Sequence, residues 1–140
     1  MIFVYYFKTT GQISKIIEAP NSAIADANAS ETEGYVVDTA GTAKEATHKV
    51  NVSSLAIEAK TTQSITPTPS SIAADGSTKS TITGIATGST FWSDQEPKVS
   101  RKTVQGSKAY FCTNIVATHT LTFKHPLYLD TEVEITATTP

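Results

Sequence analysis

The sequence contains a single cysteine, Cys112, so one chain cannot form an internal disulfide, and a disulfide-stapled secreted scaffold is excluded. The neighbours of Cys112 are Tyr110, Phe111 and Ile115, which predict a buried thiol that acts as a small apolar side chain. Charge is also scarce, because charged residues make up 17% of the chain and the net charge is −2 at pH 7. We therefore expect no nucleic-acid partner.

Long apolar runs are absent. The opening segment Met1–Phe7 is apolar but short, and it lacks the basic start of a secretory signal. No stretch approaches the roughly twenty apolar residues that a membrane-spanning helix needs. We expect a soluble, unprocessed protein that is made in the cytoplasm and has no membrane partner.

Threonine is the commonest residue, whereas leucine is rare. Threonine is β-branched, fits a pleated strand and tolerates solvent around its hydroxyl group. Periodic Ile, Val and aromatic positions at both ends argue against the alternative of a disordered Ser/Thr-rich stalk. The composition predicts an all-β protein with a thin core.

Residues 1–60 are expected to form a small N-terminal β unit. Strands at Ile2–Phe7 and Gln12–Glu18 would make a hairpin, because Gly11 can adopt the positive φ of a tight turn. Pro20 would end the second strand, and 21–33 reads as a loop with one helical turn. Further strands are expected at Gly34–Asp38, Thr47–Val52 and Leu55–Lys60.

Residues 61–70 are rich in Thr and contain Pro67 and Pro69, which favour extended backbone, so we expect a linker there. Residues 71–140 are then expected to fold as an immunoglobulin-like antiparallel β-sandwich. Its clearest strand is Glu132–Ala137, where Glu132 and Glu134 alternate with apolar residues and suggest an exposed sheet edge. The remaining strands are expected at Thr78–Ile85, Ser89–Ser93, Val99–Val104, Ala109–Val116 and Thr118–Lys124.

Residues with catalytic or metal-binding chemistry are few. His48, His119 and His125 do not have the spacing of a metal site, and we expect His119 on a strand surface and His125 at a strand end. Cys112 and His119 could meet across a hairpin, but no third residue would orient the pair. We therefore expect a non-enzymatic protein without catalytic residues, metal or cofactor.

Aromatic residues cluster at the N-terminus, where so little chain surrounds the first strand that we expect one of its faces to remain open. Each aromatic residue has two interpretations, a core position or an anchor at a protein interface, and for Trp92 the core is the commoner role. The candidate interface residues are Phe3, Tyr5, Tyr6, Phe7, Tyr35 and Trp92.

Two segments resemble known families. The hairpin Tyr5-Tyr6-Phe7-Lys8-Thr9-Thr10-Gly11-Gln12-Ile13, followed by Glu33-Gly34-Tyr35-Val36-Val37-Asp38, resembles the N-terminal region of small virion and tail-region proteins of tailed bacteriophages. In that pattern Phe7-Lys8 replaces a more usual Tyr-Asp. The Ala74-Asp75-Gly76 turn with its Thr-Ile strand, and the closing stretch 128–137, resemble bacterial and phage immunoglobulin-like domains.

The resemblance implies a non-enzymatic structural protein of a phage virion. Within this hypothesis we expect a tail-associated accessory or fibre-attachment module, with capsid decoration as the alternative. Its partners would be tail or capsid subunits and further copies of itself in a small oligomer. The remaining alternatives are a carbohydrate-binding module of a bacterial surface adhesin, with Trp92 and Tyr110 as its aromatic platform, and a small enzyme.

Overall fold

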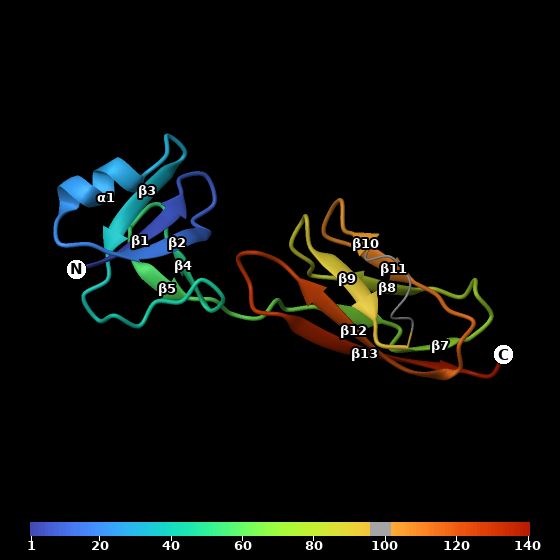
Figure 1. The fold of residues 1–140 in the computed structure, drawn as a ribbon. Coiled ribbons are helices and arrows are strands. Elements are labelled where there is room, and N and C mark those ends of the chain that lie inside the picture. Colours follow the sequence, from blue (N-terminus) through green and yellow to red (C-terminus); the bar gives the residue numbers. More distant parts are fainter. Residues whose placement is uncertain (96–101) are drawn as a thin grey trace. The chain divides into compact units, whose positions relative to one another are not determined.

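The computed structural model describes residues 1–95 and 102–140, and these divide into two compact units (Figure 1). Unit 1 comprises Met1–Thr61 and unit 2 comprises Thr62–Pro140. Strands dominate both units, as the composition predicts. The expected all-β fold class is confirmed.

Unit 1 is built around an antiparallel sheet in which β1 (Ile2–Phe7) lies between β2 (Ile13–Glu18) and β3 (Glu33–Val37). A short helix, α1 (Ser22–Asn28), connects β2 to β3. A second pair of strands follows, β4 (His48–Val50) and β5 (Ile57–Ala59). The predicted N-terminal hairpin is therefore present, and Gly11 has the expected positive φ of 81°.

Strand β1 is buried on both faces. Phe3 and Tyr5 pack into one apolar cluster together with Ala25 of α1. Val4 and Tyr6 point the opposite way and pack into a second cluster, which contains Val50 of β4 and the partly buried Ile57 of β5. The expectation that too little chain surrounds this strand to cover both faces is wrong, because α1 covers one face and the β4–β5 pair covers the other.

Helix α1 is longer than the single turn expected from its Ala-rich sequence. Asn21 caps it, because its side-chain oxygen accepts a hydrogen bond from the Ile24 amide, which satisfies a backbone donor of the first turn. The hydroxyl group of Tyr5 donates to the backbone oxygen of Ala25 at 2.8 Å. Packing against the sheet therefore stabilises a helix that would be marginal in isolation.

Unit 2 is a sandwich of two sheets. The five-stranded sheet has the order β10-β9-β12-β13-β7, and the three-stranded sheet has the order β11-β8-β6. The strands are β6 (Thr66–Thr68), β7 (Ser71–Ala73), β8 (Ser80–Thr83), β9 (Thr90–Ser93), β10 (Lys102–Thr103), β11 (Ala109–Phe111), β12 (Ala117–Lys124) and β13 (Thr131–Thr138).

The two sheets share one apolar core. Leu121 and Phe123 of β12 and Ile135 of β13 are fully buried, and the ring of Phe123 stacks on Phe91 with 5.1 Å between centroids. The first two strands of unit 2 belong to different sheets. Strand β6 pairs antiparallel with β8 in the three-stranded sheet, whereas β7 pairs parallel with β13 in the five-stranded sheet. Such a division joins the two layers in the manner of an immunoglobulin-like sandwich.

Three expectations about unit 2 have different outcomes. The segment 61–70, expected as a linker, contains β6, and the buried side chain of Gln63 donates to Ser89 and accepts from the Ala86 amide. Strand β13 pairs with β12 over Thr131–Ala137 but with β7 only at Thr136–Thr138, so the exposed Glu132 and Glu134 lie outside the pairing with β7. Of the expected strand 99–104, residues 99–101 lie outside the described residues.

We predict that Gly11→Ala destabilises unit 1 strongly. A Cβ atom at Gly11 would lie 2.0 Å from the backbone oxygen of Val50, in addition to the strain of a φ of +81°. Gly41→Ala is the matched control in the same unit, because its φ is +69° but its Cβ would meet only Ile2 at 3.4 Å. The control should cost about 1–2 kcal/mol, and Gly11→Ala clearly more.

Hydrogen exchange followed by mass spectrometry measures the stability of each unit separately in the full chain. Equal effects of the two substitutions would contradict the close approach of the β1–β2 turn to β4.

Candidate functional site

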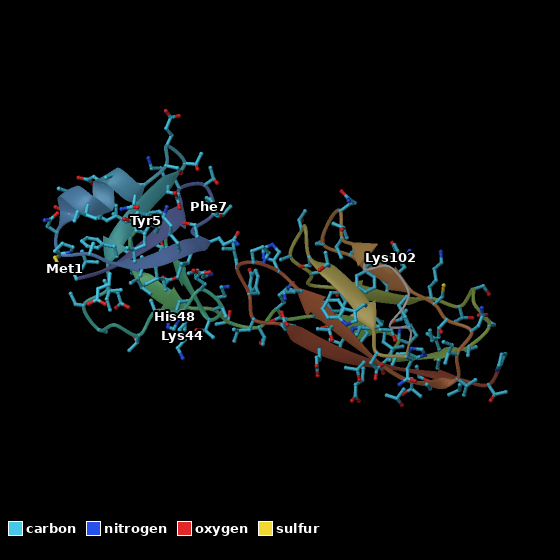
Figure 2. All side chains as sticks on the ribbon, in the orientation of Figure 1. Met1, Tyr5, Phe7, Lys44, His48 and Lys102 are labelled. Carbon is cyan, nitrogen blue, oxygen red and sulfur yellow. The ribbon has the colours of Figure 1, made fainter. Side chains whose placement is uncertain are left out.

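The aromatic residues predicted as an interface are mostly in the core of unit 1. Phe3 and Tyr5 are fully buried and Tyr6 is 8% exposed. Figure 2 shows Tyr5 within the unit and Phe7 toward the end of β1. These three buried side chains therefore present no surface to a partner in the folded protein.

Phe7 and Tyr35 are the predicted residues of unit 1 that reach the surface. Phe7 is 36% exposed, whereas Tyr35 is half-buried with its ring against Phe3 and Tyr5. The Tyr35 hydroxyl group donates to an oxygen of Asp26 at 2.6 Å, and this hydrogen bond raises the pKa of Tyr35. Tyr35 therefore ties β3 to helix α1.

Trp92 is a surface residue of unit 2, so the expectation of a core position is wrong. On β9 the side chains of Phe91 and Ser93 point inward, and Phe91 fills the core position. Trp92 is half-buried on the outer face, opposite Thr122 of β12. The period of two along β9 allows only one of the two adjacent aromatic residues to enter the core.

The polar centre of unit 1 is Glu33, which is only 9% exposed. Its carboxylate accepts hydrogen bonds from the Ser14 hydroxyl group and from the Ser30 amide, and Lys15 lies 3.3 Å away. These hydrogen bonds, Ser14 first, lower the pKa of Glu33 to about 2. Because its partners come from β2 and from the α1–β3 connection, Glu33 holds the edges of the sheet together.

The three histidines lie apart in separate structural settings. His48 accepts from the Lys44 amide at 3.2 Å in the turn before β4, and both residues are labelled in Figure 2. His125 follows the end of β12, which confirms the expected strand-end position. His119, expected on a strand surface, is instead fully buried.

His119 makes two hydrogen bonds inside unit 2. Its Nε2 donates to the backbone oxygen of Ile115 at 2.9 Å, and its Nδ1 lies 2.9 Å from the Ser93 hydroxyl oxygen. The Ser93 oxygen in turn accepts from the Gln95 amide. These hydrogen bonds join β12 to β9 and hold the His119 ring inside the sandwich.

Cys112 is exposed, so the prediction of a buried thiol is wrong. Phe111 points into the core, so the next residue, Cys112, points outward, whereas His119 points inward. The Cys112–His119 pair considered from the sequence therefore has its two side chains in different environments.

Within residues 1–95 and 102–140, no group of three or more metal-ligating side chains exists, and no helix is long and apolar enough to cross a membrane.

The candidate interaction site is the β4–β5 hairpin tip, which we define as residues 51–56. Asn51 organises the tip, because its side-chain oxygen accepts from the Ser53 and Ser54 amides and its backbone oxygen accepts from the Leu55 amide at 2.7 Å. Val52 and Leu55 project from this turn and are 43% and 50% exposed.

Leu55 has a backbone φ of +60°, and it is the only non-glycine residue with a positive φ among the described residues. A left-handed conformation costs an L-residue about 1–2 kcal/mol. Leu55 was expected at the start of a half-buried strand, but that strand begins at Ile57. The sequence signal that was missed is Asn51 four residues earlier, since Asn side chains favour turns.

The chain matches no protein-family model, no curated protein and no solved structure.

We predict that Glu33→Gln removes part of the acid sensitivity of unit 1. The pKa of about 2 in the folded protein lies below the ordinary value of 4.5. The Glu33 carboxylate therefore stabilises the folded unit fully above pH 4.5, and this contribution is lost as the pH falls from 4.5 toward 2. The variant should be less stable at pH 7 and should show a weaker pH dependence across this window.

Urea denaturation at a series of pH values measures this effect. Asp38→Asn is the control, because hydrogen bonds from the Ala43 and Gly41 amides also lower the pKa of Asp38. This control should retain the contribution of Glu33. A Glu33→Gln profile parallel to that of the wild type would contradict the assignment.

We predict that His119→Phe destabilises unit 2 by about 1–3 kcal/mol, because the buried hydroxyl group of Ser93 and the backbone oxygen of Ile115 each lose a hydrogen-bond partner while the ring volume is kept. His125→Phe, at a partly exposed position of the same unit, should cost less. Chemical denaturation followed by Trp92 fluorescence measures both variants. Unchanged stability of His119→Phe would contradict the structural role of this histidine.

Proposed function

We propose that this chain is a non-enzymatic structural protein of a tailed-bacteriophage virion, acting as a tail-associated accessory or fibre-attachment module. In this proposal, unit 1 attaches the chain to a neighbouring tail or capsid subunit and unit 2 is presented from it. The proposal starts from the resemblance of residues 5–13 and 33–38 to phage virion proteins. Its location would be the assembled particle.

The observation that carries the proposal is the division of the chain into two units with separate apolar cores. Each core consists of residues from its own unit, so one unit can be held by a partner while the other remains displayed. The two buried polar groups with the most suggestive chemistry, Glu33 and His119, are engaged in hydrogen bonds that hold strands together. This use of polar groups is typical of a structural module.

Capsid decoration remains the second candidate, because a two-unit β protein that binds a shell subunit would serve that role equally well. The carbohydrate-binding alternative has weaker support. Trp92 lies on the outer face of the five-stranded sheet, whereas Tyr110, 61% exposed, points outward from the three-stranded sheet. The two aromatic residues therefore lie on opposite faces of unit 2 and do not form one platform.

We expect an antibody against unit 2 to label the tail of intact particles in immunogold electron microscopy. Labelling spread over the heads would support capsid decoration in place of the tail assignment. Particles without label, in a preparation whose denatured proteins also lack the chain by immunoblotting, would contradict a virion role altogether.

A further inference from the structure

The hairpin tip has an unusual combination of backbone and side chain. Position 55 requires a left-handed backbone, which glycine or asparagine adopts at little cost. The sequence instead has leucine there, and half of its side-chain surface is exposed. Leu55 belongs to neither apolar cluster of unit 1, so packing within the unit does not compensate for its backbone strain.

Hydrogen bonds and packing hold the rest of the tip. Three backbone amides of the turn donate to Asn51, and the side-chain amide of Asn51 donates to Glu58 at 3.1 Å. Val52 approaches the β1–β2 turn, where one of its methyl groups lies 3.4 Å from the Cβ position of Gly11. Leu55 is therefore presented on a hydrogen-bonded turn that lies against the β1–β2 turn of the central sheet.

The charge around the tip distinguishes between two kinds of target. Residues 52–55 are uncharged, and the nearest charged cross-strand pair, Lys49 opposite Glu58, carries both signs. A tip that inserts into an anionic membrane is usually flanked by unbalanced basic residues. A neutral tip with exposed aliphatic side chains, Val52 and Leu55, fits an apolar pocket on a protein surface instead.

We propose that the hairpin tip is the docking element of unit 1, and that Leu55 inserts into an apolar pocket of a neighbouring virion subunit. This inference rests on the proposed function, because it names the part of the chain that makes the attachment. Leucine is kept at position 55 in spite of the backbone strain because its side chain makes the contact with the partner protein. Such strained positions concentrate at sites of function.

The test compares the content of purified particles grown in a host that supplies either the wild-type chain or a variant, measured by quantitative mass spectrometry against the major shell protein. Leu55→Asn suits the left-handed backbone and removes the aliphatic side chain. We expect its incorporation to fall about ten-fold or more, which corresponds to the loss of about 1.4 kcal/mol of binding free energy. Leu55→Met, which keeps an apolar side chain, should be incorporated nearly as well as the wild type.

The thermal stability of Leu55→Asn is measured in parallel, and its midpoint should be equal to or higher than that of the wild type. A loss of incorporation together with retained stability separates docking from folding. Val116→Asn is the matched control, because Val116 is an exposed aliphatic residue of unit 2, with 57% of its surface exposed. This control should be incorporated normally.

The outcomes separate this inference from the proposed function. Absence of the wild-type chain from particles would overturn the proposed function and the inference with it. Presence of the wild type with equal incorporation of Leu55→Asn, or an equal loss for Val116→Asn, would overturn the role of the tip alone. Binding of the wild type to phosphatidylglycerol vesicles that is lost in Leu55→Asn would also overturn it, in favour of a lipid target.

Discussion

The burial of β1 on both faces is the constraint on which unit 1 depends. The run Phe3-Val4-Tyr5-Tyr6 sends alternate side chains into two separate apolar clusters, one beneath α1 and one beneath the β4–β5 pair. Parity along a strand makes this arrangement unavoidable, because consecutive residues point to opposite faces. Phe3, Tyr5 and Tyr6 are thereby committed to the core, so in the proposed attachment other residues would have to contact the partner.

The same constraint shows what the sequence could predict. The N-terminal hairpin, the Gly11 turn, the Asp75-Gly76 turn and the alternation along 132–137 follow from local patterns, and the structure contains all of them. A continuous apolar strand has no alternation to read, so its own sequence does not reveal whether one face or both are covered. The covering elements are separated from β1 along the chain, and tertiary packing alone brings them there.

The sequence-based prediction of single positions was wrong where it followed the type of residue and not its place in the inward–outward alternation of the strand. His119 has the same parity as Leu121 and Phe123, so the alternation that placed those two residues in the core also places the histidine there. Cys112 follows the inward-pointing Phe111 and faces outward for the same reason. Leu55 could not be placed by parity, because its position depends on a turn that Asn51 organises. The candidate site was thus the part of the molecule least accessible from sequence.

Hydroxyl-radical footprinting of the full chain, free and within purified particles, tests most directly whether the aromatic strand is core and the hairpin tip is the contact surface. We expect weak modification of Tyr5 and Tyr6 in both states, and strong modification of Leu55 in the free chain that is suppressed in the particle. Strong modification of Tyr5 and Tyr6 in the free chain, suppressed in the particle while Leu55 remains reactive, would contradict both assignments.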